Sequence, residues 1–397
     1  MIPLRHELRL TLTRDEKARA GFVSALRRHV LDTLAREVRQ DYQSQVEPGL
    51  TRDGLEPGAE DIHRALRGRD AFRFYSALRV GSQDMLYQTV RPAVEREQDR
   101  LVSTAERLSH KPGLGTLTLH PGLAVPRSVS AVDIHLMPGS YDTEYREADL
   151  TMGSVFENRL AISTFGVFGP NLDDIGQSIA RFVRERHPGF APRNILDLGC
   201  TVGHNTGAWK DVFPAASVRG IDVAAPCLRY AAARARAQGR AVDFEQMNAE
   251  DLQFPDHSFD VVFSSMFLHE VPARGIPRVL AEAYRVLRPG GLMLHMELPP
   301  AGQLSAFDSW YLDWDGHYNN EPFYRAFRAM DPRRIVAAAG FDPRDYTQHV
   351  VPSYSALGAE AWRAAVAEAE PGVASDKTGR LGSGIRWFCF GAWKQPR

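Results

Sequence analysis

Apolar residues near the start of the chain recur at the spacing of an α-helix. The stripe consists of Phe22, Leu26, Val30 and Leu34. Residues four apart lie on one face of a helix, so these side chains are expected to face a core. Thr13 and Glu16 have the spacing of a capping box, which predicts the start of this helix. We expect the helix to end near Tyr42, before a turn-rich loop over residues 44–60.

Two further helices are predicted before the pattern changes. One covers about residues 61–78, and the other starts after Ser82 and is expected to kink at Pro92. Their inward-facing side chains are expected to be Ile62, Leu66, Phe72, Tyr75, Leu86, Val90, Val94 and Leu101. We therefore expect a mainly helical N-terminal domain over residues 1–137.

The periodicity changes after Lys111. Residues 116–119 and 131–136 alternate between apolar and polar side chains, which predicts a small strand pair. After a helix near residues 172–186, strand patterns alternate with helical ones, which predicts a parallel sheet covered on both faces. The expected strands are 194–198, 217–221, 241–246, 259–265, 292–298, 345–351 and 385–394. The predicted fold is α/β, a Rossmann-like, seven-stranded, mostly parallel sheet in a second domain over residues 138–397.

Composition and charge are those of an ordinary globular protein. The chain has 44% hydrophobic and 24% charged residues and a net charge of −1. This balance gives no overall field that would attract nucleic acid or an anionic membrane. The three cysteines have no metal-binding spacing, and we expect no bound metal. The sequence has neither a signal-peptide pattern nor an apolar run of membrane-spanning length, so a cytoplasmic location is expected.

The segment from Asn194 to His204 combines a short apolar strand with a glycine turn. Asp197 stands at the carboxyl end of the strand, where ligands bind in open α/β sheets. Gly199 can adopt the turn without a steric penalty, and Gly203 allows the next helix to approach the strand closely. The N-terminus of that helix is a site for a polar ligand. The spacing differs from the Gly-x-Gly-x-x-Gly pattern of nicotinamide cofactors, which disfavours a dehydrogenase.

This turn, Asp-Leu-Gly-Cys-Thr-Val-Gly, resembles motif I of the class I S-adenosylmethionine (SAM) methyltransferases. The resemblance extends over residues 190–298 and implies SAM as the cofactor and a last strand that inserts antiparallel. It implies cofactor contacts from Asp197, Gly199, Cys200 and Gly203. Thr201 replaces the middle glycine that is usual in the family. We therefore expect a negative φ at Thr201 and a loop that lies slightly off the methionine moiety.

Three further strand ends match the same family. Asp222, followed by Val223, is expected to bind the ribose hydroxyls, and a helix cap is the alternative role. Asn248 and Ala249 fall on the positions that meet the adenine ring in the family, and a polar turn is the alternative. Ser265 is expected to line the mouth of the cofactor pocket.

His269 and Glu270 follow the fourth predicted strand, in the segment Phe-Leu-His-Glu. The segment resembles the Leu-His-Asp of small-molecule O-methyltransferases, whose histidine takes a proton from the acceptor hydroxyl. The resemblance makes His269 a candidate general base, and Glu270 is the nearest group that could orient it. Neighbours on a helical turn point about 100° apart, which argues against that pairing. A purely structural role for His269 is an equally open alternative.

Aromatic side chains are dense over residues 310–324. Such large surfaces suit either the core of a domain interface or a lid over a substrate. The expected substrate contacts are Tyr141, Tyr145, Trp310, Trp314 and His317.

The predicted function is transfer of the SAM methyl group to a small organic acceptor, with a hydroxyl favoured, by in-line displacement. The expected partner is this small molecule, and neither nucleic acid nor membrane is expected. The helical N-terminal domain is predicted to cover the acceptor or to form a homodimer. Two alternatives stay open: methylation of RNA or protein, and a SAM-binding regulator without transferase activity.

Overall fold

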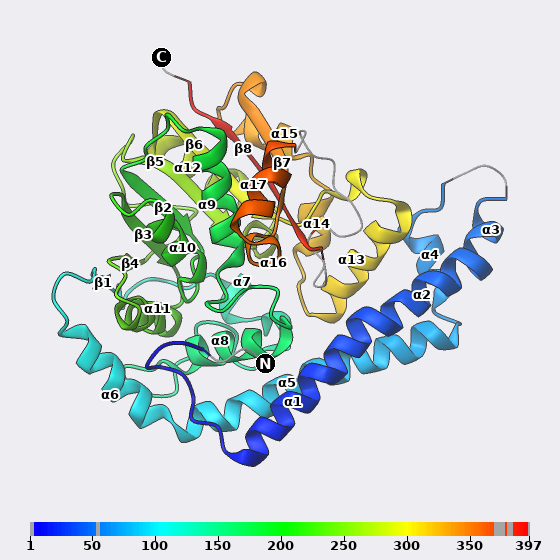
Figure 1. The fold of residues 1–397 in the computed structure, drawn as a ribbon. Coiled ribbons are helices and arrows are strands. Elements are labelled where there is room, and N and C mark those ends of the chain that lie inside the picture. The colour runs from blue at the N-terminus through cyan, green and yellow to red at the C-terminus, as the bar shows by residue number, and fades with distance from the viewer. Residues whose placement is uncertain (1–3, 53–55, 369–377, 379–383, 396–397) are drawn as a thin grey trace.

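The computed structural model describes residues 4–52, 56–368, 378 and 384–395. A twisted sheet and its helices form the body of the molecule, and long N-terminal helices run along its lower side (Figure 1). The C-terminal strand returns into the sheet, and the chain ends at the opposite side from those helices (Figure 1).

The eight described strands form one sheet in the order β1-β4-β3-β2-β5-β6-β8-β7. They are β1 (Leu117–Thr118), β2 (Asn194–Leu198), β3 (Ser217–Asp222), β4 (Asp243–Gln246), β5 (Phe259–Ser265), β6 (Leu287–Glu297), β7 (Tyr346–Pro352) and β8 (Arg386–Trp393). Strands β1 to β6 pair in parallel, and β8 runs antiparallel to β6 and β7. The predicted α/β class, the seven predicted strands and the antiparallel last strand are confirmed. Strand β1 adds an eighth at the edge.

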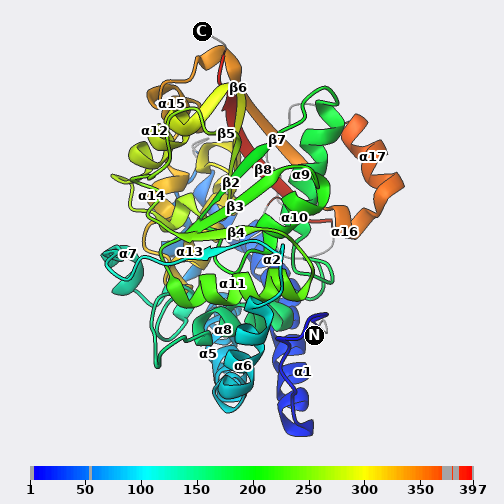
Figure 2. The same cartoon turned by 90° about the vertical axis from the view of Figure 1, so that its left-hand side faces the viewer.

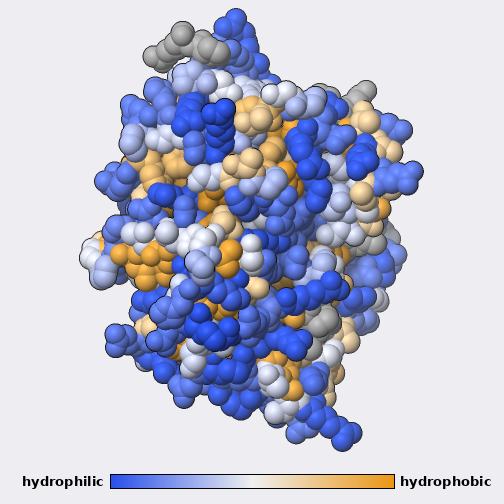
Figure 3. All heavy atoms as spheres, turned by 60° about the vertical axis from the view of Figure 1, so that its left-hand side comes forward, coloured by the Kyte–Doolittle hydropathy of each residue, from blue (hydrophilic) through white to orange (hydrophobic). Residues whose placement is uncertain are grey.

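Helices cover both faces of the sheet (Figure 2). They include α9 (Asp174–Arg186), α10 (His204–Val212), α11 (Ala225–Ala237), α12 (Ile276–Val286) and α15 (Pro332–Ala338). Helices α9 and α10 share a core with Val261 and Phe263 of β5, whereas α12 and α15 share one with Val262. Successive strand residues point to opposite faces, so a strand covered on both sides is apolar at every position. On the surface, the face drawn in Figure 3 carries mainly hydrophilic residues with scattered hydrophobic groups.

The N-terminal region is helical, as predicted. Its elements are α1 (Arg14–Arg28), η1 (His29–Leu34), α2 (Ala35–Asp41), η2 (Tyr42–Val46), α3 (Glu47–Leu50), α4 (Ala59–Leu66), α5 (Asp70–Arg96) and α6 (Gln98–Ser109). The predicted capping box is confirmed, because the Thr13 hydroxyl accepts from the Glu16 amide and the Glu16 carboxylate accepts from the Thr13 amide. The predicted inward-facing residues of α4, α5 and α6 are buried.

Three details of these helices differ from the sequence prediction. The first helical run continues beyond Tyr42 to Leu50 through two π-helical segments, η1 and η2. Part of the predicted loop over residues 44–60 is therefore helical, and its Asp-Gly turn at residues 53–54 lies outside the described residues. The break predicted between the second and third helices, at residues 79–82, lies instead at residues 67–69, because α5 runs from Asp70 to Arg96. Pro92 lies inside α5, and the kink expected there stays a prediction.

Phe22 is the third difference, since 58% of it is exposed. Val23 is buried and takes the inward position that was expected for Phe22. A helix repeats every 3.6 residues, so a stripe of strictly four-residue steps drifts around its surface.

The predicted strand pair over residues 116–119 and 131–136 does not form. Leu117 and Thr118 pair with β4 at the sheet edge instead. Residues Ile134–Leu136 form a short 3₁₀ turn, η3, in which His135 has a left-handed φ of 59°. A turn in which Ile134 is the one buried residue of the segment 131–136 fits the same apolar–polar alternation.

The N-terminal helices pack directly against later elements. Helices α1 and α5 contact α8 (Thr151–Ser163), and α4 contacts α13 (Ala306–Tyr318). The remaining elements are α7 (Arg127–Ser130), η4 (Leu268–Glu270), η5 (Ala301–Gln303), α14 (Tyr324–Arg328), η6 (Pro343–Asp345), α16 (Tyr354–Leu357) and α17 (Ala359–Ala367). The domain boundary near residue 137 stays a prediction.

Candidate functional site

A cavity of about 590 Å³ lies at the carboxyl ends of the parallel strands. Asp197 of β2, Asp222 of β3, Asn248 after β4 and Ser265 of β5 all line it. In an open α/β sheet this edge is where ligands bind, because the loops there leave a crevice. The other predicted cofactor residues that line the cavity are Gly199, Cys200, Val223 and Ala249.

The glycine turn after β2 is as tight as its sequence requires. Gly199 has a φ of 66°, and a Cβ there would overlap the ring of Phe267, another cavity residue. Gly203 has a φ of 70°, and its Cβ would lie 2.7 Å from the ring of Phe244. Gly203 therefore serves the packing of α10 and is not among the residues that line the cavity.

Thr201 contradicts the expectation of a negative φ. Its φ is +49°, so a β-branched residue occupies the left-handed region that its glycine counterpart would enter freely. The Thr201 amide donates to Oδ2 of Asp222 over 2.9 Å. This hydrogen bond holds Thr201 in the conformation that a glycine would adopt at this position. The displaced loop was expected because of a negative φ, so that expectation loses its basis.

Asp197 is a buried acid and Asp222 a half-buried one, and both accept hydrogen bonds. Asp222 accepts from the amides of Thr201 and Ala224, one at each oxygen, so each oxygen keeps a lone pair for a further donor. Burial raises the pKa of Asp222 to about 6, although these two amides oppose the shift. Burial also raises the pKa of Asp197 to about 7, against the hydrogen bond from the Thr206 hydroxyl. A bound hydrogen-bond donor or cation would stabilise the ionised form of both acids.

Asn248 forms the polar turn that the sequence left open as an alternative, and its contact with adenine stays a prediction. Its Oδ1 accepts from the Glu250 amide over 3.0 Å, which is a polar turn, and its side chain also lines the cavity. Ser265 likewise faces the cavity, and its hydroxyl is buried without a partner among the described residues.

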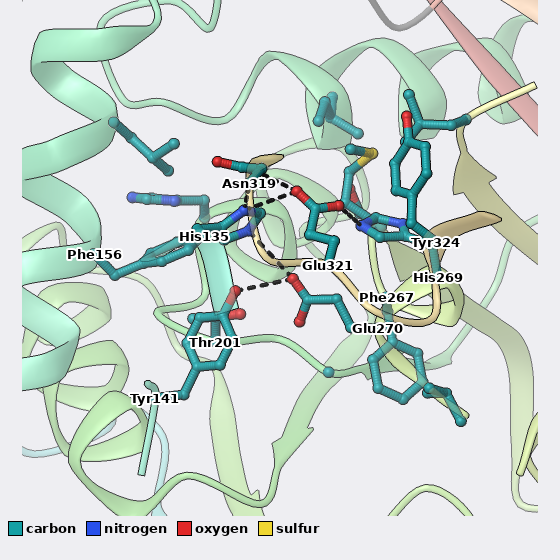
Figure 4. Close-up of a pocket in the computed structure, with 18 of the residues that line it drawn as sticks. His135, Tyr141, Phe156, Thr201, Phe267, His269, Glu270, Asn319, Glu321 and Tyr324 are labelled. Carbon is teal, nitrogen blue, oxygen red and sulfur yellow. Dashed lines mark hydrogen bonds and ion pairs between the residues drawn. The ribbon is translucent and has the colours of Figure 1, made fainter. Parts of the chain in front are cut away.

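Acids and histidines alternate along one wall of the cavity (Figure 4). The Tyr141 hydroxyl donates to Glu270 over 2.9 Å, and the same carboxylate lies 3.3 Å from Nε2 of His135. Nδ1 of His135 lies 3.1 Å from Glu321, whose other oxygen is 3.7 Å from Nε2 of His269. Asn319 also donates to Glu321. We call Glu270, His135, Glu321, His269 and Glu297 the acid–histidine chain.

Glu297 ends this chain, and it is the orienting partner of His269 in place of Glu270. Nδ1 of His269 lies 2.6 Å from Glu297, which also accepts from the amides of Phe267 and Leu268. Burial alone would lower the pKa of His269, but Glu297 and Glu321 raise it to about 9. His269 therefore carries a proton on both nitrogens at neutral pH, which does not fit a resting general base.

The charges of the rest of the chain follow from the same contacts. Burial opposes ionisation of Glu321, but His135 and His269 lower its pKa to about 2. The pKa of Tyr141 is well above its usual value because the phenol is buried and faces Glu270. Glu321 is thus a carboxylate and Tyr141 a neutral hydrogen-bond donor at physiological pH.

Of the predicted substrate contacts, Tyr141 alone is among the described residues that line the cavity. Tyr145 is 49% exposed and lies under Arg91, and His317 is exposed at the end of α13. Trp310 and Trp314 are buried in an aromatic cluster with side chains of α4 and α5. Of the two roles that the sequence left open for these tryptophans, packing between helices is the one that their contacts support.

Sequence reasoning missed most of the acid–histidine chain. Glu297 could have been found, because it ends β6 at the same sheet edge as the other predicted acids. His135 lies in a 3₁₀ turn and Glu321 in the aromatic segment over residues 310–324, and nothing in the sequence of either segment marks these two side chains as partners of His269 or Glu270.

Two features are absent from the described residues, a metal-binding cluster and a membrane-spanning helix. These residues contain no group of three or more His, Cys, Asp or Glu side chains that could hold a metal ion. In the same part of the chain, every helix is too short or too polar to cross a membrane.

Residues 195–291 match the family model described as a methyltransferase domain. The chain carries a class I methyltransferase domain. The match runs from β2 to the first residues of β6. It therefore includes β2 to β5, whose carboxyl ends form the sheet edge of the cavity. SAM is the cofactor of this domain.

Similarity to known proteins covers part of the chain. The demethylmenaquinone methyltransferase of Thermus thermophilus is 38% identical over 110 residues, which are 28% of this chain and 49% of that protein. Phthiotriol/phenolphthiotriol dimycocerosates methyltransferase 1 of Mycobacterium ulcerans is 30% identical over 170 residues, 42% of this chain and 56% of that protein. The chain thus spans about half the length of these curated relatives. A solved SAM-dependent methyltransferase of Thermotoga maritima, a possible histamine N-methyltransferase, is 17% identical with a TM-score of 0.36, covering 56% of this chain and 91% of that one.

The cavity edge of the methyltransferase domain fits SAM. Asp222 has free lone pairs for the ribose hydroxyls, and Asn248 offers an amide beside the position expected for adenine. The buried, unpartnered Ser265 hydroxyl and the protonatable Asp197 supply further polar contacts. SAM, when bound, would supply an electrophilic methyl group to this chamber.

Proposed function

We propose that this protein transfers the methyl group of SAM to a small organic acceptor held in the same cavity. One observation carries the proposal. The cavity that begins at the sheet edge continues to side chains of α1, α5, α8 and α13, among them Arg27, Gln83, Phe156 and Tyr311. Cofactor residues and helices outside the matched domain therefore share one chamber, as a reaction that must exclude water requires.

The size of this chamber supports a small acceptor over RNA or protein. A volume of about 590 Å³ lies in the range of pockets that enclose single small molecules. The two relatives above are named for demethylmenaquinone and for phthiotriol and phenolphthiotriol dimycocerosates, which are different acceptors. They support methyl transfer to an organic molecule without specifying which one.

A hydroxyl group is the acceptor that we favour, with Glu270 as the group that receives its proton. His269 is already protonated at neutral pH, whereas Glu270 lines the cavity and is hydrogen-bonded to Tyr141. His135 then links Glu270 to the rest of the chain. In this proposal Tyr141 and Glu270 position the hydroxyl, and the histidines compensate the buried negative charge.

Methyl labelling tests the proposal. The purified protein is incubated with deuteromethyl-labelled SAM and a cell extract that is separated into small-molecule, nucleic-acid and protein fractions. We expect the label in a compound of the small-molecule fraction, and we expect none after heat denaturation of the enzyme. Label in RNA or protein would support the corresponding alternative. SAM binding without label in any fraction would support a SAM-binding regulator.

A further inference from the structure

Five arginines line the cavity, and three of them are buried. Arg27 of α1, Arg79 of α5 and Arg159 of α8 are 5%, 4% and 8% exposed. Their helices pack on one another, so three guanidinium groups from separate parts of the sequence meet at the same wall. Guanidinium groups are seldom fully buried without a charged partner.

Three of the five arginines have such a partner. Arg79 forms a two-pronged ion pair with Asp315, with Nε and Nη2 at 2.7 and 3.2 Å from the two carboxylate oxygens. At the more exposed end, Arg36 pairs with Asp32, and Arg39 pairs with Asp308.

Arg27 and Arg159 differ from the other three. Over the described part of the chain, neither has a carboxylate within ion-pair distance. Nε and Nη1 of Arg27 and Nε of Arg159 are buried without a hydrogen-bond partner there. Burial, together with the neighbouring Arg79 and Arg159, lowers the pKa of Arg27 to about 9, so it still carries its charge at neutral pH.

The nearby acids are already engaged. Asp315 is held by Arg79, Glu321 by His135 and Asn319, and Glu270 by Tyr141 and His135. Two positive charges at the helical wall are thus left without an internal counter-charge. Keeping an unpaired ion away from water costs several kcal/mol, and a bound anion would recover much of that cost through charge-assisted hydrogen bonds.

We propose that Arg27 and Arg159 bind an anionic group of the acceptor, a carboxylate or a phosphate. The inference rests on the proposed function and adds the class of substrate to it. Binding of the anionic group by these arginines would also orient the acceptor. The guanidinium of Arg159 lies 4.7 Å over the ring of Phe156, and that ring is 5.7 Å from the ring of Tyr141. An acceptor anchored at Arg159 would extend across Phe156 towards the Tyr141–Glu270 pair.

Calorimetric titration of the protein saturated with S-adenosylhomocysteine tests the inference. The probes are benzoate and phenyl phosphate, with benzamide as the neutral control of the same size. We expect at least one anion to bind roughly tenfold or more tightly than benzamide, as the strength of hydrogen bonds to charged groups implies. Preference for benzoate or for phenyl phosphate distinguishes a carboxylate from a phosphate.

Arg27→Gln and Arg159→Gln assign the effect to the two arginines. Each should weaken anion binding roughly tenfold or more and leave the affinity for S-adenosylhomocysteine unchanged. Arg19→Gln, at an exposed position of the same helix as Arg27, should change neither. Without a probe, both buried variants should melt no lower than the wild type, because they remove an unpaired charge.

Two outcomes would overturn the inference: binding of neither benzoate nor phenyl phosphate more tightly than benzamide, or anion binding that survives both buried substitutions. In each of these the bound S-adenosylhomocysteine leaves the proposed function standing. Failure of S-adenosylhomocysteine itself to bind would overturn the proposed function, and this inference with it.

Discussion

At the scale of single residues, the assignment of the proton acceptor depends on which group of the acid–histidine chain is free to take a proton. We expect Glu270→Gln to lower kcat by roughly 10²–10⁴-fold, the usual contribution of a positioned base, with little change in affinity for S-adenosylhomocysteine. The measurement is turnover of the acceptor found by labelling, together with calorimetry. Wild-type kcat in Glu270→Gln would rule out this role.

His269 should behave differently. Its pKa in the folded protein, about 9, exceeds the unfolded value of 6.5, so it stabilises the fold fully below pH 6.5 and loses that effect as pH rises through 9. The shift corresponds to at most about 3 kcal/mol. Urea unfolding should show a loss of stability in His269→Gln at pH 6.5 that shrinks towards pH 9.5.

The pH dependence of turnover separates the two residues. If His269 is not the base, the pH profiles of kcat in the wild type and in His269→Gln should have the same shape between pH 7 and 9. If kcat instead rises towards a midpoint near 9 and this rise is absent in His269→Gln, His269 is the base after all.

The sequence located residues that sit at strand ends, whose cofactor contacts stay predictions, and missed those that meet only in the folded chain. Asp197, Asp222, Asn248 and Ser265 were predicted at the cavity and line it, because the end of a buried strand can be recognised locally. Of the partners of His269, Glu297 also ends a strand, whereas Glu321 could not be recognised in this way. Glu321 lies 52 positions further along, and the buried arginines belong to three helices with no motif between them.

At the scale of elements, the turn after β2 contains a strained residue. Thr201 has a φ of +49°, and a left-handed conformation costs an L-residue with a Cβ roughly 1–2 kcal/mol. We expect Thr201→Gly to stabilise the protein by up to about 1 kcal/mol, because the greater freedom of glycine in the unfolded chain offsets part of the gain. Urea unfolding measures this change.

The same variant checks the role of the loop. Its amide still donates to Asp222, so the affinity for S-adenosylhomocysteine should be maintained. A destabilised Thr201→Gly protein would mean that the threonine side chain makes stabilising contacts that outweigh its strain.

Secondary structure was predicted most reliably where burial on both sides makes the pattern unambiguous. The seven strands of the sheet match their predicted places within a few residues, apart from an earlier start of β6. The pattern over residues 131–136 misled because a turn that buries Ile134 has the same polar–apolar alternation as a short strand. The aromatic segment of α13 was equally ambiguous, since packing and substrate contact need the same side chains.

At the scale of the whole molecule, the helical region and the sheet depend on each other. Helices α1 and α5 pack on α8, α4 packs on α13, and β1 pairs with β4. We expect a single cooperative unfolding transition, with the same midpoint by circular dichroism and by tryptophan fluorescence. Two separate transitions would indicate that the predicted domains over residues 1–137 and 138–397 fold independently.

The central claim is that SAM binds along the carboxyl ends of β2 to β5, and the affinity for S-adenosylhomocysteine tests it most directly. Calorimetry should show binding to the wild type that weakens in Asp222→Ala by a factor corresponding to roughly 1–3 kcal/mol. Asn248→Ala should weaken it independently, whereas Asp99→Ala at an exposed position of α6 should not. Circular dichroism confirms that each variant is folded. Unchanged affinity in both folded Asp222→Ala and Asn248→Ala would contradict the placement of the cofactor and the account built on it.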